Sequence, residues 1–190
     1  MYRKLFLFAI LWVLVAGVFA WAQQSVLRKQ INGTWILKDI TLSPEYFRTC
    51  EEWKEFLKEI DYIEDIPDPH QYSSVTSYKN YLKKFKYELM KAAFEEYKAS
   101  MVDQYTMIMT EQNRVVNIHP DSRDTSYWYT ERQDSVLVYD PSRIGKEGDI
   151  TRFTIDYISK DSMVMRRSDL ENEKMYYHFK KKQSGRLNNN

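Results

Sequence analysis

Cysteine and histidine are both scarce in this chain of 190 residues. Its one cysteine is Cys50, so no internal disulfide can form and the fold has to be stable without one. The three histidines, His70, His119 and His178, are far apart and lack the paired spacing of metal ligands, so we interpret them as isolated residues. The sequence therefore predicts neither a metal site nor a bound cofactor.

A surplus of charge and the short motifs of common enzymes are also absent. The chain has 28 basic and 27 acidic residues, and this balance is not the footprint of a protein that binds nucleic acid. It contains no G-x-S-x-G, no H-E-x-x-H and no glycine-rich phosphate loop. Because the sequence shows no recognisable pair of a nucleophile and a general base, we expect a protein that is not an enzyme.

Long apolar runs are absent except at the N-terminus. Arg3 and Lys4 precede an apolar run that ends in Ala20-Trp21-Ala22, which supplies small residues at the two positions that a signal peptidase reads. We predict a signal peptide over residues 1–22 and an exported chain, periplasmic or extracellular, with no stable membrane span after cleavage. The alternative is a retained N-terminal anchor, because the run approaches the ~20 apolar residues of a membrane-spanning helix.

The chain after the signal fits one domain over residues 23–183, followed by a disordered tail over 184–190. Its hydrophobic period changes twice, and the change to a helical period marks an insertion over about residues 47–101. The predicted fold class is mainly β with an α insertion. Two helices are expected between the first strand and the second.

The first predicted helix begins at a capping box formed by Thr49 and Glu52. Cys50 lies in its first turn, where we predict a buried thiol; the alternative is a thiolate favoured by the helix dipole. The apolar face of this helix comprises Trp53, Phe56, Leu57 and Ile60. A second helix is predicted over 77–101, and its apolar stripe comprises Leu82, Phe85, Leu89, Ala93, Tyr97 and Met101.

The rest of the domain consists of short segments that alternate between apolar and polar residues and are separated by turn residues. This pattern is typical of antiparallel strands joined by hairpins. The predicted strands are 33–42, 104–110, 114–119, 125–131, 134–140, 150–158, 162–168 and 174–182. About eight antiparallel strands in sequence order close most naturally into an up-and-down barrel, because closure leaves no exposed edge strand.

Both ends of the predicted mature chain resemble the lipocalin family. Asn32-Gly33-Thr34-Trp35 leads into the first strand and is similar to the lipocalin G-x-W signature. The run from Phe153 to Met165 and the segment from Tyr177 to Lys180 are similar to the closing hairpins of exported bacterial lipocalin-like domains. The resemblance implies a calycin-type β-barrel, with Gly33 and Trp35 as the signature at its closed end. It does not extend over residues 43–101.

The predicted strands carry large apolar residues at every second position, which places them on one face of each strand. Methionine and tyrosine suit an adaptable ligand cavity, because a thioether deforms around a guest and a phenol offers a polar group. The candidate ligand-binding residues are Met107, Met109, Tyr127, Tyr129, Phe153, Ile155, Tyr157, Met163, Met165, Tyr177 and Phe179. The alternative is that the same side chains fill the barrel solidly.

Two functions remain open at this point. The first is a carrier or sensor of a small apolar ligand held in the barrel, with the helices either capping the mouth or packing against the barrel. The second is a non-catalytic protein-interaction module, such as an inhibitor, an immunity-type protein or an envelope assembly factor, with a filled barrel. A cavity of a few hundred cubic ångströms favours the first function, and an exposed apolar patch favours the second.

Overall fold

The computed structural model describes residues 26–130, 135–139, 150–167 and 174–183. Its helices and strands agree closely with the sequence pattern, and most strand ends lie within two residues of the predicted ones. The elements are β1 (Gly33–Leu42), α2 (Tyr46–Thr49), α3 (Glu51–Asp61), α4 (Val75–Met101), β2 (Thr106–Met109), β3 (Arg114–Ile118), β4 (Arg123–Thr130), β5 (Ser135–Tyr139), β6 (Ile150–Ile158), β7 (Ser162–Arg167) and β8 (Met175–Lys181).

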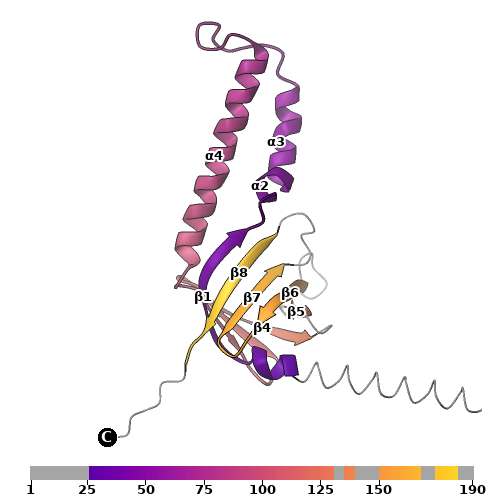
Figure 1. Ribbon diagram of the computed structural model, residues 1–190, viewed down its shortest axis with the longest axis vertical. Coiled ribbons are helices and arrows are strands. Elements are labelled where there is room, and N and C mark those ends of the chain that lie inside the picture. The colour runs from indigo at the N-terminus through magenta and orange to yellow at the C-terminus, as the bar shows by residue number, and fades with distance from the viewer. Residues whose placement is uncertain (1–25, 131–134, 140–149, 168–173, 184–190) are drawn as a thin grey trace, which may run out of the picture.

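The eight strands form a closed barrel in sequence order, β1 to β8 (Figure 1). Every neighbouring pair is antiparallel, and β1 closes the ring by pairing with β8 from Trp35↔Lys181 to Leu42↔Met175. The predicted class, an up-and-down antiparallel barrel with a helical insertion between the first two strands, is confirmed. The closure pairs both edges of the sheet, which would otherwise expose unpaired backbone groups.

One end of the barrel is closed by a short helix over residues 26–31 (Figure 1). The Trp35 indole is fully buried there, and its Nε1 donates a hydrogen bond of 2.6 Å to the Ile31 carbonyl. The Lys181 ammonium lies 4.9 Å from the Trp35 ring centroid and donates to the Gln30 carbonyl at 3.0 Å. A cation over the ring and a satisfied indole N–H together fix this end of the barrel.

Gly33 leaves room for the Lys181 side chain, which crosses over the first strand at this position. Its φ is +136°, a conformation that side chains with a Cβ rarely adopt. A Cβ built there would lie 2.4 Å from Cε of Lys181. The glycine of the G-x-W pattern is therefore favoured by its backbone angle, and a larger residue there would also displace the flexible end of the Lys181 side chain.

The helices form an arm that projects from the other end of the barrel (Figure 1). α3 and α4 pack on each other through Trp53, which stacks edge-on with Tyr87 at 6.4 Å, and through an ion pair of 2.5 Å between Lys86 and Glu52. Only the C-terminal part of α4 reaches the barrel, where Phe94 and Met101 pack against its core. The expectation that both helices lie on the barrel is thus wrong for most of their length.

The capping box predicted at Thr49 and Glu52 does not form. Cys50 is the N-cap residue of α3 and makes no capping hydrogen bond through its side chain. Thr49 ends the extra short helix α2, and its hydroxyl donates to the Glu45 carbonyl at 3.0 Å. The short helix α2, which we did not predict, ends at Thr49, so this threonine belongs to α2 and does not cap α3.

The predicted apolar stripe of α4 matches the packing face only in part: Met101 packs against the barrel core. Met90, outside the stripe, is the buried residue of this helix. Phe85 and Leu89, inside the stripe, are 52% and 51% exposed. The 3.6-residue period identified the helix, but α4 carries apolar residues on two faces, and the period alone does not say which face meets α3.

No helix in the described residues is long and apolar enough to cross a membrane. The predicted signal peptide over 1–22 and the predicted tail over 184–190 lie outside the residues that the structure describes.

We expect Gly33→Ala to lower the free energy of unfolding by about 1–3 kcal/mol, because φ is strained and Lys181 must leave Trp35. Urea denaturation of Gly33→Ala, Lys181→Ala and the double variant would measure this. The two single losses should not add, because the double variant has no lysine to displace. Fully additive losses would show that the contact with Lys181 does not matter.

Candidate ligand-binding cavity

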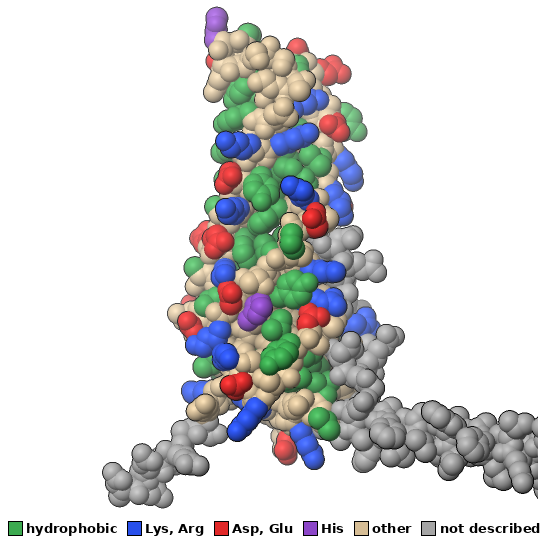
Figure 2. Space-filling view, in the orientation of Figure 1, with side chains coloured by type: hydrophobic (Ala, Val, Ile, Leu, Met, Phe, Trp, Pro, Cys, Tyr) green, Lys and Arg blue, Asp and Glu red, His purple; other side chains and the backbone are tan. Residues whose placement is uncertain are grey.

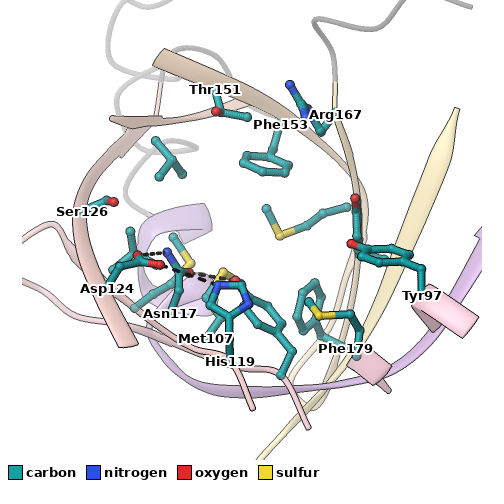
Figure 3. Close-up of a pocket in the computed structure, with 17 residues that line it drawn as sticks. Tyr97, Met107, Asn117, His119, Asp124, Ser126, Thr151, Phe153, Arg167 and Phe179 are labelled. Atoms are coloured by element: carbon teal, nitrogen blue, oxygen red, sulfur yellow. Dashed lines mark hydrogen bonds and ion pairs between the residues drawn. The ribbon is translucent and has the colours of Figure 1, made fainter. Parts of the chain in front are cut away.

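A cavity of about 410 Å³ occupies the half of the barrel nearest the helical arm (Figure 3). The other half is filled by Trp35, Trp128 and their neighbours, which are fully buried. The cavity arises because the inward positions toward the arm carry side chains such as Ser126 and Thr151, which are too short to meet across the barrel. A volume of this size accommodates a small organic molecule.

The floor and walls of the cavity are largely apolar. Alternate positions of β2, β6, β7 and β8 turn methionine and phenylalanine side chains into the barrel, as the pleat of a strand dictates. The apolar lining residues are Met107, Met109, Phe153, Met165 and Phe179, together with Val115 and Val138. Three thioethers give this wall a shape that can adjust to a guest.

A hydrogen-bonded polar group lines one side of the mouth (Figure 3). The Tyr105 hydroxyl donates to Oδ1 of Asn117 at 2.7 Å, and Nδ2 of Asn117 donates to Oδ1 of Asp124 at 2.7 Å. Nε2 of His119 lies 3.6 Å from Oδ2 of Asp124. This chain fixes the orientation of the asparagine and leaves the second oxygen of Asp124 beside the histidine.

The last turns of α4 supply the other side of the mouth through Tyr97 and Met101. They are held against β1 by an ion pair of 2.6 Å between Lys98 and Asp39. The hydrogen bond from Lys98 keeps the pKa of Asp39 below its usual value. Asp103, with φ of +61°, then reverses the chain, and its amide donates to the Leu37 carbonyl at 2.8 Å. The helix that lines the mouth is therefore tied to the barrel wall.

Burial raises the pKa values of two phenols at this mouth, Tyr105 and Tyr177, above their usual range. The nearby Asp124 carboxylate adds to the effect on Tyr105. For Tyr177, the further contribution comes from Tyr97, which is close enough for a side-chain hydrogen bond. Both phenols stay neutral at physiological pH, and the hydroxyl proton of Tyr105 is already donated to Asn117.

The structure brings only part of the predicted ligand-binding set into the cavity. Met107, Met109, Phe153, Met165, Tyr177 and Phe179 line it. Ile155 and Met163 face inward as well, but they are buried in the core below the cavity and do not line it.

The predicted tyrosines of β4 and β6 lie on the outside of the barrel. Tyr127 and Tyr129 are 37% and 39% exposed, because Ser126 and Trp128 take the inward positions of β4. Tyr157 is 54% exposed, because a register shift between Ile155 and Tyr157 turns the strand there. The alternation was recognised correctly, but the inward face was misassigned in one strand and changed by a bulge in the other.

Sequence reasoning missed the polar lining residues, among them Asn117, Asp124 and Ser126. One signal could have found Ser126: it alternates with Trp128 on the face opposite the two tyrosines. Asp124, for which we predicted no binding role, also lines the mouth through its side chain. His119, which we interpreted as isolated, also lines the mouth. His70 lies exposed in the loop that joins α3 to α4.

Other expectations concerned cysteine and metals. Cys50 is buried, as predicted, and its Sγ lies 3.7 Å from the Phe47 carbonyl oxygen. The described residues contain no group of three or more histidine, cysteine, aspartate or glutamate side chains that could hold a metal ion.

A closed barrel of eight antiparallel strands in sequence order, with a buried G-x-W tryptophan at one end, is the arrangement that the sequence resemblance implies. The fold is lipocalin-like. The chain is similar to the crystal structure of a lipocalin-like protein from Bacteroides uniformis, with a TM-score of 0.38 and 10% sequence identity, over 80% of this chain and 99% of that one. No family model and no curated protein matches the chain. The fold assignment thus stands on the strand pairing itself.

We expect the free energy of unfolding to fall as the pH rises above about 10, because the unfolded chain releases the protons of Tyr105 and Tyr177 before the folded chain does. Below that pH the contribution is fully present. Tyr105→Phe and Tyr177→Phe should each reduce the alkaline slope by up to about 1.4 kcal/mol per pH unit. Urea denaturation between pH 9 and 11 measures the slope, with Tyr62→Phe, at an exposed position, as control. An unchanged slope in both variants would contradict the burial of these phenols.

Proposed function

We propose that this protein binds a small, largely apolar molecule inside its lipocalin-like barrel and acts as a carrier or sensor. The observation that carries the proposal is the 410 Å³ cavity, whose inner part is lined by methionine, phenylalanine and valine side chains. A cavity with mostly apolar walls and a few polar groups at fixed positions is the usual form of a small-molecule site.

The polar side of the mouth suggests how such a molecule is oriented. Its apolar part would lie among Met107, Met165 and Phe179, where it displaces water from apolar surface. A hydrogen-bonding group would face Asn117 and Asp124, whose side chains are already positioned by Tyr105. The proposed role is binding rather than catalysis.

The alternative, a protein-interaction module, has an observation of its own. The outer face of α4 exposes Tyr81, Phe85 and Leu89, which are 47%, 52% and 51% accessible. Exposed apolar stripes of this kind mark interaction surfaces. The interaction-module alternative predicts a filled barrel, so the cavity favours ligand binding as the primary function. The exposed face of the arm remains available for contacts with another protein.

Export is part of the proposal. The basic start, short apolar centre and Ala20-Trp21-Ala22 end support a signal peptide, and the mature chain would then be periplasmic or extracellular. The mass of the protein purified from its own envelope fraction would reveal cleavage after Ala22. A mass that includes residues 1–22 would instead support the retained anchor.

Two neighbouring residues of β4 allow a matched test of the cavity. Ser126 is 8% exposed and lines the cavity, whereas Thr125 points outward. We expect Ser126→Phe to fill the cavity and to weaken binding of the neutral fluorescent probe N-phenyl-1-naphthylamine at least about tenfold, with Thr125→Phe binding as the natural chain does. Fluorescence titration measures both, and circular dichroism checks the fold. Equal binding by the two variants would place the probe outside the barrel.

Native mass spectrometry would identify the natural guest. The mature protein, purified gently from its envelope fraction, should carry a reproducible small molecule that denaturing extraction releases. Ser126→Phe, which fills the cavity, should abolish this association, whereas Thr125→Phe should retain it. An empty barrel, or a stable protein partner in its place, would favour the interaction module.

A further inference from the structure

The outer face of α4 is an apolar surface that is only partly covered within the described residues: Tyr72 packs on Tyr81 at a ring-centroid distance of 5.3 Å, and Leu89 borders the cleft between α4 and the start of α3. Tyr81, Phe85 and Leu89 follow one another at intervals of four residues, so they lie on one side of the helix. All three are about half exposed, although Tyr81 and Phe85 stack at a centroid distance of 6.1 Å. Figure 2 shows hydrophobic side chains along the arm between charged ones. Large apolar side chains in such a row are costly to leave in water.

This face also has a regular repeat. Tyr78, Phe85, Ala92 and Ala99 recur every seven residues, the spacing that keeps one seam of a helix turned toward a partner helix. Large rings occupy the half of the seam toward the tip of the arm, and alanines occupy the half toward the barrel. Ala92 and Ala99 are exposed. A seam that is large at one end and small at the other is complementary to itself when it is turned end for end.

We propose that α4 pairs with α4 of a second copy of this chain, antiparallel, about a two-fold axis that passes close to Leu89. Tyr81 then lies against Ala99 of the partner subunit, and Phe85 lies against Ala92 of the partner subunit. Alanine at these positions lets the two helices approach closely while each ring covers a small side chain. The pairing goes beyond ligand binding and does not depend on it.

The charges on α4 are compatible with this register. Lys84, Glu88, Lys91 and Glu95 lie on one flank of the seam, and all four are exposed. A two-fold axis that makes the helices antiparallel brings this flank onto its own copy. Lys84 then faces Glu95 of the partner subunit, and Glu88 faces Lys91 of the partner subunit. None of the four forms an ion pair within the part of the chain that the structure describes.

In a parallel two-fold pair this flank would lie on the far side of the seam from its own copy, so the four residues would not pair with one another. The reciprocal ion pairs are therefore available only to the antiparallel arrangement.

The rest of the arm leaves room for this partner. The opposite side of α4 is occupied by α3, through Lys86 and Glu52, and by the barrel, through Phe94 and Met101. A helix of 27 residues is about 40 Å long, so the arms can overlap along their length while the two barrels lie at opposite ends. Isologous contacts of this kind are the commonest way to close a dimer.

Charge reversal tests the register directly. Sedimentation equilibrium of the full chain should show a dimer, and Lys84→Glu or Glu95→Lys alone should weaken it at least about tenfold, because attraction becomes repulsion at both symmetric contacts. The combined Lys84→Glu and Glu95→Lys variant should restore the dimer, because opposite charges face each other again. Phe85→Ser should also weaken the dimer, with Tyr157→Ser, exposed on the barrel, as the matched control.

Crosslinking tests the position of the axis. In a Cys50→Ser background, Leu89→Cys should form a disulfide-linked dimer on mild oxidation. Tyr78→Cys should not, because the two copies of that position would lie roughly 35 Å apart along the antiparallel pair. Crosslinking at both positions would indicate a parallel pair and overturn the proposal.

Three other results would also overturn it. One is a chain that is monomeric at every concentration, a second is a dimer that withstands both single charge reversals, and a third is a monomer that binds lipid vesicles or another protein through Phe85. Circular dichroism confirms in each case that the variant is folded. Binding of the naphthylamine probe is measured in parallel, because loss of the dimer with the probe still bound separates this proposal from the proposed function.

Discussion

The pairing of β1 with both β2 and β8 is the constraint on which the rest of the structure depends. It closes the sheet, creates an interior and satisfies both edges at once. More than sixty residues separate β1 from β2 in the chain, yet they pair because Asp103 and Tyr105 bond back to Leu37 as soon as α4 ends. These bonds anchor the insertion where it leaves the barrel, and α3 and most of α4 extend away from the barrel.

Within the closed barrel, side-chain size divides the interior into a packed half and a hollow half. Trp35 and Trp128 fill the end of the barrel that the helix over residues 26–31 closes. The Lys181 ammonium lies over the indole ring of Trp35. Toward the arm, Ser126 and Thr151 leave the interior open. The same strands therefore provide stability at one end and a binding cavity at the other, and neither end has to serve both purposes.

The arm connects the cavity to an exposed apolar surface. Tyr97 and Met101 line the cavity mouth, while Phe85, three turns earlier on the same helix, lies exposed on the opposite side. α4 is a continuous helix, and the ion pair of Lys98 with Asp39 holds it to β1. A partner bound to its outer face would therefore also affect the position of the α4 residues at the cavity mouth. The site inside the barrel and the surface outside it thus share one rigid element.

By itself, the sequence determined the number and order of the strands and the place of the helices, because these follow from local periodicity. The place of Gly33 and Trp35 at the closed end was implied by the resemblance to lipocalins. Only the tertiary structure decided which face of β4 points inward and which face of α4 meets α3. Alternation gives two equivalent faces to every strand, and a bulge such as the one before Tyr157 exchanges them. The polar mouth at Asn117 and Asp124 depends on the pairing of β3 with β4, which places these two residues opposite each other, and the sequence pattern alone did not show that their side chains point into the barrel mouth.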